Sequence, residues 1–149
     1  MTVAIEPANQ PAVEDMLHAG ETFARSLYST DECFLLDLSE LDTPGTTVFV
    51  ARIDGDARGM VALVDGGDST AELKRLFVHD SARGLGLAQA LLGAAEAHAR
   101  DARVEVILLE TGTRSTAAIA LYEKAGYTHI PRFGPYVDSE TSVCMEKRL

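Results

Sequence analysis

The middle of the chain contains Leu76-Phe-Val-His-Asp-Ser-Ala-Arg-Gly-Leu-Gly-Leu-Ala-Gln89, a strand-like apolar segment followed by a short loop and a glycine-rich helix start. The first turn of a helix has backbone N–H groups without intrahelical partners, and its dipole favours an anion there. Gly84, Gly86 and Ala88 keep side-chain bulk away from those groups. Arg83 can add a charge-assisted hydrogen bond. The stretch therefore predicts a phosphate or anion site.

Several interpretations of this loop compete. A dinucleotide-binding fingerprint needs Gly or Ala at the position of Gln89, and no P-loop pattern occurs. The pattern that fits is Gln/Arg-x-x-Gly-x-Gly/Ala, over residues 83–88. The structural alternative is that the glycines only allow close helix–strand packing. Basic residues near the loop favour a specific anionic ligand: Lys74, Arg75 and His79.

Composition excludes several classes of protein. The 149 residues include 23 acids against 13 Lys and Arg, a formal charge of −10, which disfavours a general nucleic-acid or membrane-surface role. The longest apolar run, Ala117 to Tyr122, is far shorter than the roughly 20 residues of a membrane helix. Residues 1–6 lack the features of a signal peptide. We therefore expect one domain over residues 1–149, in the cytoplasm.

Cysteine and histidine give no metal motif. Cys33 and Cys144 cannot form a disulfide framework, and no CxxC or Cys/His cluster offers a zinc site. A buried, inert thiol is the commoner state of a free cysteine. The scattered histidines are expected to be solvated or packed in the core rather than ligands: His18, His98 and His129.

The first half of the chain predicts a helix and an antiparallel meander. A strand over 2–5 precedes a helical period that runs from Val13 to Leu27, and 28–45 is a loop or a short second helix. Strands over 46–52 and 58–64 flank Asp54-Gly55-Asp56, a hairpin signal. A turn over 65–68 leads to a strand over 71–78.

The second half changes to alternating helix and strand. The expected elements are a helix over 84–99, a strand over 104–109 covered on both faces, a helix over 115–124, and strands over 127–130 and 142–147. The first helix should bury one face: Leu85, Ala88, Leu92, Ala95 and Ala99. Ser115 is the expected cap of the second helix and Gly126 its end. The fold class is a single α/β domain with a mixed, mostly antiparallel central sheet flanked by helices.

Three motifs together resemble the GNAT superfamily of N-acetyltransferases. They are residues 72–78 (ELKRLFV), 83–88 (RGLGLA) and 117–127 (AAIALYEKAGY), in the family's order. The resemblance extends from about Thr46 to the C-terminus. It implies a GNAT-like fold and acetyl-CoA as co-substrate, without a metal.

The resemblance also implies which residues bind acetyl-CoA. The pyrophosphate would lie beside Arg83, on the N–H groups of Gly84, Leu85, Gly86, Leu87, Ala88 and Gln89. The pantetheine arm would pair with the backbone of Leu76, Phe77 and Val78, in a gap between the strands over 71–78 and 104–109. Ser115 stands where many members have an Asn that contacts the cofactor, and a hydroxyl can replace part of that contact.

Two residues are candidates for catalysis. Tyr122 resembles the family tyrosine that protonates the departing CoA sulfur, and a phenol with a pKa near 10 is protonated at neutral pH. Its alternative role is packing against the helix face. Glu72 lies where some members have a general base, on the face that strand alternation gives to Lys74, Leu76 and Val78. Its alternative role is an ion pair with Lys74.

The residues that could bind the amine acceptor are less clearly marked in the sequence. A mixed segment could recruit a cationic amine or be a solvated acidic loop: Tyr28, Asp31, Glu32, Phe34 and Asp37. Phe133 and Tyr136 could form a wall, and Glu110-Thr-Gly112 is either part of the pocket or a turn.

The sequence thus predicts an acetyl-CoA-dependent N-acetyltransferase that transfers the acetyl group directly, in a ternary complex, to a small-molecule or peptide amine. The alternative is a catalytically silent CoA-binding sensor or interaction domain of the same fold. A nucleotide or NAD binder is disfavoured by Gln89. Members of the family often pair through edge strands or C-terminal segments, so a homodimer is an expectation from the resemblance.

Overall fold

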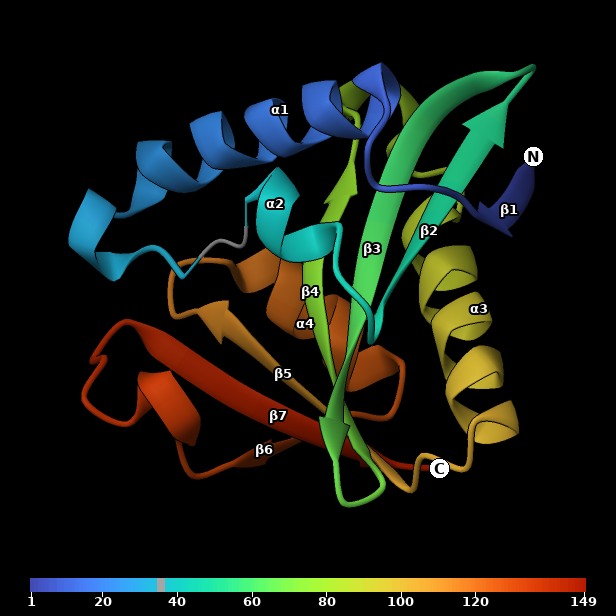
Figure 1. The fold of residues 1–149 in the computed structure, drawn as a ribbon. Coiled ribbons are helices and arrows are strands. Elements are labelled where there is room, and N and C mark those ends of the chain that lie inside the picture. The colour runs from blue at the N-terminus through green and yellow to red at the C-terminus, as the bar shows by residue number, and fades with distance from the viewer. Residues whose placement is uncertain (35–36) are drawn as a thin grey trace.

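The structure, a computed structural model, describes residues 1–34 and 37–149 and contains a seven-stranded sheet packed between helices (Figure 1). The strands are β1 Thr2–Ile5, β2 Thr46–Ile53, β3 Asp56–Gly67, β4 Thr70–Val78, β5 Val106–Gly112, β6 Thr128–Ile130 and β7 Ser142–Arg148. The helices are α1 Pro11–Leu27, α2 Leu38–Leu41, α3 Leu87–Asp101 and α4 Thr116–Lys124, with 3-10 turns η1 Thr30–Glu32, η2 Asp80–Ala82 and η3 Gly134–Tyr136. None of the helices in these ranges is long and apolar enough to cross a bilayer.

The sheet has the order β1-β2-β3-β4-β5-β7-β6. All neighbours are antiparallel except β4 and β5, which are parallel, so the expected mixed sheet with flanking helices is confirmed. The β2–β3 hairpin turns through Asp54 and Gly55, both at positive φ. β3 continues to Gly67, so the expected turn over 65–68 is confined to Asp68 and Ser69, also at positive φ.

Each face of the sheet buries its own core. α1 and α2 pack on one face, against apolar side chains of β2 and β3, whereas α3 and α4 pack on the other. Val13, Met16 and Leu17 bury the first half of α1, which begins with Pro11. Phe23, in its second half, is 51% exposed. The second half of α1 is therefore not fixed by the core and lies beside the cavity described below.

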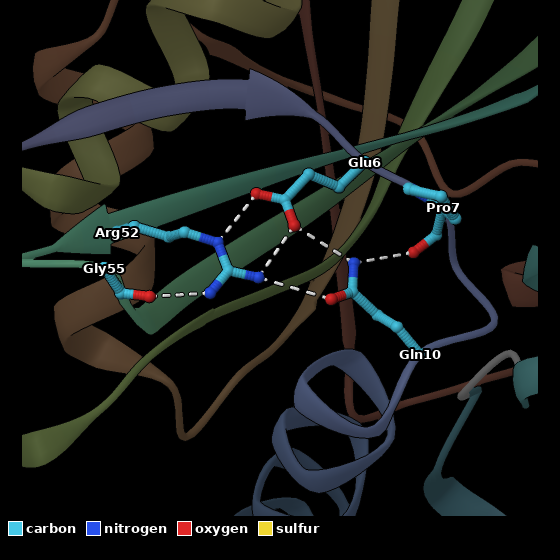
Figure 2. Close-up of polar contacts among 5 residues, drawn as sticks. All are labelled: Glu6, Pro7, Gln10, Arg52 and Gly55. Carbon is cyan, nitrogen blue, oxygen red and sulfur yellow. Dashed lines mark hydrogen bonds and ion pairs between the residues drawn. The ribbon is translucent and has the colours of Figure 1, made fainter.

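A polar cluster fixes the start of α1 to the sheet (Figure 2). The Arg52 guanidinium donates from Nε and Nη2 to the two carboxylate oxygens of Glu6, at 2.9 and 2.8 Å. Gln10 accepts from Arg52 Nη2 and donates to Glu6 Oε1. The hydrogen bond from Arg52 holds the pKa of Glu6 below its ordinary value. This network connects β1, β2 and the N-terminus of α1, so it orients the helix.

The helix expected over 84–99 begins three residues later than the sequence indicated, at Leu87. Gly84 and Gly86 have φ of +79° and +81°, outside the right-handed helical region. The expected face was also partly wrong, because Leu85 lies in the loop and is 58% exposed. The face that is buried consists of Leu87, Leu91, Leu92, Ala95, Glu96 and Ala99.

The buried strand expected over 104–109 is displaced to 106–112. Ile107 and Leu109 are fully buried, whereas Val106 and Leu108, on the other face, are only partly covered. The expectation of cover on both faces was therefore too strong. α4 begins after Ser115, as expected, and Gly126 at φ +98° follows it.

A β-bulge in β4 changes which side chains share a face. Lys74 pairs with Ala62 but Phe77 pairs with Met60, so one extra residue is inserted at Arg75, whose φ is +60°. Alternation predicted Glu72, Lys74, Leu76 and Val78 on one face, and this was wrong for the last two. Leu76 and Val78 pack with the α3 core, whereas Lys74 lies opposite Ala62 of the α1 core.

β4 and β5 separate beyond their first residues. Their parallel pairing runs from Thr70–Val106 to Leu73–Leu109 and stops there. The rest of β4 remains paired to β3, and the rest of β5 to β7. Figure 1 shows the two strands diverging toward their C-terminal ends. The gap that the resemblance implied is therefore present in the sheet.

Candidate functional site

A cavity of about 830 Å³ occupies the gap between β4 and β5. Its walls come from the second half of α1, the C-terminal ends of β4 and β5, the glycine loop before α3, and the first turns of α4. Parallel strands that diverge leave a crevice at their carboxyl ends, which is a common place for ligands in α/β sheets. Elements from both halves of the chain thus meet around one space.

The glycine loop forms one end of the cavity. A Cβ atom built on Gly84 or Gly86 meets no heavy atom within 4 Å, so the space over both residues is open. Gly86 occupies the N-cap of α3, and no side chain caps the helix. The N–H groups of the first turn are therefore free of a side-chain cap, as an anion site requires. The Arg83 guanidinium is beside them and is paired with Asp80 at 3.1 Å.

The basic residues expected near this loop are only partly gathered there. Arg75 has a side chain only 4% exposed, donates to the Leu17 carbonyl oxygen at 2.7 Å, and pairs with Glu21 of α1. Lys74 points to the opposite, α1 face of the sheet, where its partners are carboxyl and phenol groups. The β-bulge at Arg75 is the reason for this separation. Arg83 is the cation that remains beside the loop.

Tyr122 lies at the junction of the cavity and the core. Its side chain is 7% exposed, lines the cavity from α4, and packs edge-on against Tyr127 at 5.8 Å between ring centroids. Burial raises the pKa of the phenol above its ordinary value, so the hydroxyl is protonated at neutral pH. Among residues 1–34 and 37–149, no group hydrogen-bonds to this hydroxyl. It is therefore a proton donor available to a ligand.

Glu72 forms a compact polar cluster. The Tyr136 hydroxyl donates to Glu72 Oε2 at 2.6 Å, and Lys74 Nζ lies 2.6 Å from the Tyr136 oxygen and 3.4 Å from Glu72 Oε2. The ion pair with Lys74, one of the two roles that the sequence left open, is thus present, and Glu72 does not itself line the cavity. The carboxylate already has two donors, which reduces its capacity to take a proton from another molecule.

Glu110 is a second carboxylate, and the sequence did not single it out as a base. It lines the cavity at the end of β5, and Oε2 accepts the Ser142 hydroxyl at 2.6 Å. Within the described part of the chain, no donor contacts its other oxygen. Burial raises the pKa of this carboxyl above its ordinary value. The one sequence signal was its position, an acid directly after the apolar residues 106–109.

Tyr28 closes the cavity across the gap, from the C-terminus of α1. Its hydroxyl lies 3.0 Å from Ser115 Oγ and accepts the Arg114 backbone N–H at 2.8 Å. The Ser115 hydroxyl, expected to cap α4, therefore pairs with Tyr28 instead. Gly112 lies directly under the phenol, and a Cβ at this position would overlap the Tyr28 ring and hydroxyl.

We expect Gly112→Ala to destabilise the fold by about 1–3 kcal/mol, because the methyl group overpacks against Tyr28. Tyr28→Ala removes the ring that the new methyl group would meet. The double variant is therefore expected to lose less unfolding free energy than the two single variants lose in sum. Denaturant unfolding of the four proteins measures this coupling. Additive effects would show that Gly112 is not constrained by Tyr28.

One residue of the acidic segment before β2 lines the cavity, and others lie at the surface. Glu32 lines the cavity, with its Oε1 accepting the Ser29 N–H at 2.8 Å, whereas Asp37 caps α2 by accepting from Glu40 N. Asp31 is exposed. Phe34 and Phe133 both pack edge-on against Tyr136 and so support the Glu72 cluster.

The remaining candidates have ordinary environments. Cys144 is buried, and Cys33 is half-buried beside the cavity with its pKa raised by burial, as inert thiols are. His98 packs against Phe49, and His129 lies 3.9 Å from Glu123. In the described ranges, no three His, Cys, Asp or Glu side chains are grouped so that they could hold a metal ion.

Comparison with known proteins gives a consistent family. The acetyltransferase (GNAT) family model matches residues 10–127. An IAA acetyltransferase of Azospirillum brasilense is 37% identical over all of this chain and 98% of its own. A Klebsiella pneumoniae protein assigned as an acyl-CoA N-acyltransferase superposes with a TM-score of 0.88 at 32% identity, covering 99% and 97% of the two chains. A GNAT acetyltransferase of Elizabethkingia anophelis with acetyl-CoA bound has the same fold, with a TM-score of 0.74, 18% identity and coverage of 99% and 97%.

Proposed function

This chain belongs to the acetyltransferase (GNAT) family and is an acyltransferase, and from that we propose that it transfers the acetyl group of acetyl-CoA directly to a primary amine. The observation that carries the proposal is the cavity itself, which joins an uncapped, glycine-rich helix start to a protonated phenol and to the carboxylate of Glu110. Because the walls come from α1 through to Thr141, we propose that residues 1–149 act as one catalytic domain.

The donor site follows from the open backbone of this cavity. The N–H groups of residues 84–89 and the Arg83 guanidinium would hold the pyrophosphate, and the edge of β4 at residues 76–78, unpaired on the side of β5, would hold the pantetheine arm. Ser115 would contact the arm only after exchanging its hydrogen bond with Tyr28. The similar fold that binds acetyl-CoA supports this donor.

Gly86→Val should weaken acetyl-CoA binding by about 10- to 100-fold, because a β-branched residue is strained at φ +81° and its methyl groups enter the open space over the loop. Gly55→Val is the matched control, since Gly55 has φ +85° and an equally open Cβ position in the distant β2–β3 turn. Calorimetric titration with acetyl-CoA compares the two. Equal affinities in the two variants would contradict the phosphate-loop assignment.

Acetyl transfer needs three groups of the protein: a general base, a donor that stabilises the carbonyl oxygen, and a general acid. Bound acetyl-CoA supplies the activated acetyl thioester. Glu110 takes a proton from the acceptor ammonium, which leaves a neutral amine as nucleophile. A backbone N–H near Phe77, where the bulge separates β4 from regular pairing, stabilises the negative charge that develops on the carbonyl oxygen.

Tyr122 completes the transfer. The amine nitrogen bonds to the acetyl carbon while the carbon–sulfur bond breaks, and the Tyr122 hydroxyl donates its proton to the sulfur. The second proton lost by the nitrogen restores the phenol through solvent, and the proton on Glu110 passes to water. The products are an amide, free CoA and one released proton.

Glu72 remains the other candidate base. Its contacts with Lys74 and Tyr136, and its absence from the residues that line the cavity, favour a role in holding those two side chains in place. Glu110 is favoured as the base because it lines the cavity and burial moves its pKa toward neutrality.

Two-substrate kinetics test the proposal. Direct transfer in a ternary complex predicts initial-velocity plots that intersect when acetyl-CoA and an amine such as 2-phenylethylamine are both varied. Parallel lines would indicate an acetyl-enzyme and contradict direct transfer. Binding of acetyl-CoA without turnover, for any amine tested, would favour the silent CoA-binding domain instead.

A further inference from the structure

The acceptor end of the cavity has an uneven balance of charge. The carboxylates that line it are Glu32 and Glu110, and the cations are Lys74, Arg75 and Arg114. Each cation already has a carboxylate partner, and two of these partners lie outside the cavity lining: Lys74 is 3.4 Å from Glu72, Arg75 is 3.7 Å from Glu21, and Arg114 is 4.0 Å from Glu32. The remaining carboxylate, that of Glu110, forms no ion pair in the described part of the chain and is bonded to the Ser142 hydroxyl. The site is therefore complementary to a single positive charge.

The cations at this end are also held by other groups. Arg114 donates to the carbonyl oxygen of Leu27 at 2.8 Å and stacks on the Tyr28 ring at 5.5 Å. Lys74 donates to the Tyr136 oxygen. Arg75 is tied to Leu17 and Glu21 of α1. A carboxylate on the acceptor would therefore have to share a cation that already pairs with a carboxylate of the protein.

The second half of α1 contributes an apolar wall to the same cavity. It includes Gly20, Phe23, Ala24 and Leu27, and Phe77 of β4 also lines the cavity. Burying a charged group against such a wall without a partner is costly, whereas an alkyl or aryl group gains from contact with it. The carboxylate of Glu110 therefore favours an ammonium group on the acceptor, whereas the apolar wall favours an alkyl or aryl group on the same molecule.

We propose that the acceptor is a primary monoamine with an apolar substituent and no carboxylate, an inference that rests on the proposed acetyl transfer. The ammonium pairs with Glu110, and the substituent lies against Ala24, Leu27 and Phe77. A zwitterionic amino acid brings a carboxylate that finds no free cation. A diamine brings a second ammonium, and Glu32 is already bonded to the Ser29 N–H and close to Arg114.

Matched acceptors test this class. The values of kcat/KM for acetylation are compared within two pairs, 2-phenylethylamine against phenylalanine and hexylamine against 1,6-diaminohexane. We expect the monoamine to be preferred by at least about tenfold in each pair, the effect of one unpaired charge in a partly buried site. The amino group of phenylalanine is the less basic, so more of it is unprotonated at neutral pH and the expected preference opposes intrinsic reactivity.

A charge-changing variant tests the wall. Ala24→Lys adds a cation to it, so the preference for 2-phenylethylamine over phenylalanine should fall at least about threefold. Ala24→Met, similar in length and neutral, is the matched control and should keep the wild-type preference. Thermal unfolding of both variants verifies that they fold.

The outcomes separate this inference from the proposed function. Efficient acetylation of phenylalanine or 1,6-diaminohexane in preference to its monoamine overturns the acceptor class and leaves acetyl transfer intact. No acetylation of any of the four compounds, by enzyme that binds acetyl-CoA, overturns both. Monoamine preference in wild type that is reduced by Ala24→Lys, and not by Ala24→Met, supports the inference.

Discussion

Replacing Tyr122 by phenylalanine is expected to lower kcat by about 10²- to 10⁴-fold, the range that a general acid contributes. The phenol is protonated because burial raises its pKa, and its hydroxyl has no partner in the described part of the chain. The ring still fills its place beside Tyr127 without the hydroxyl. The acetyl-CoA Kd should therefore change by less than roughly threefold, since the lost bond is one that forms mainly as the sulfur leaves.

Tyr127→Phe is the matched control for this experiment. It removes a hydroxyl from the neighbouring ring, which donates to Glu96 at 3.1 Å in the core and does not line the cavity. A cost of about 1 kcal/mol in unfolding free energy is expected, with kcat nearly unchanged. Steady-state kinetics at saturating substrates compare the two variants. A Tyr122→Phe enzyme with wild-type turnover would remove the role assigned to Tyr122.

Glu110→Gln is expected to lower kcat at neutral pH by about 10²- to 10⁴-fold, because glutamine cannot take the proton of the ammonium. The wild-type pH profile should have an acidic limb that belongs to this carboxyl. Activity requires the ionised form, and burial raises the pKa, so kcat falls as the pH is lowered through a value above that of an ordinary glutamate. The variant should lose this limb, while its amide oxygen can still accept the Ser142 hydroxyl.

Glu72→Gln distinguishes the two candidate bases. It leaves an oxygen for the Tyr136 hydroxyl but removes the ion pair with Lys74, so a smaller loss of kcat is expected and the acidic limb should persist. The reverse pattern, with the limb lost in Glu72→Gln and kept in Glu110→Gln, would assign the base to Glu72.

The glycine loop shows what could be predicted from local sequence. Its function depends on backbone N–H groups and on glycines, so residue types at fixed spacing were enough to place it after a strand and before a helix. The exact start of α3 was not predictable, because Gly84 and Gly86 adopt positive φ that periodicity does not reveal. Leu85 was assigned to the buried face for the same reason.

The bulge in β4 shows what local sequence concealed. Arg75 at φ +60° is an unusual residue for that conformation, and nothing in the alternation of residues 70–78 marks it. Its side chain is held by α1, an element about fifty residues away in the sequence. The faces of Leu76 and Val78 therefore depended on a tertiary contact that a strand pattern does not contain.

Non-local pairs explain the rest of the site. Glu110 is a base candidate only because Ser142 and the cavity surround it, and Gly112 is constrained only because Tyr28 lies over it. Ser115 is a residue type that often caps a helix, but its hydroxyl hydrogen-bonds to the Tyr28 hydroxyl and not to the helix backbone. Each of these contacts joins segments at least thirty residues apart.

The central claim is that one cavity moves an acetyl group from CoA to an amine, and transfer of a labelled acetyl group tests it most directly. The purified protein is mixed with acetyl-CoA carrying ¹³C in the acetyl group and with 2-phenylethylamine, and the amide and free CoA are measured by mass spectrometry. The account predicts labelled amide and free CoA in equal amounts, at a rate that Tyr122→Phe and Glu110→Gln both reduce. Free CoA released without labelled amide, or amide formed no faster than without the protein, would contradict it.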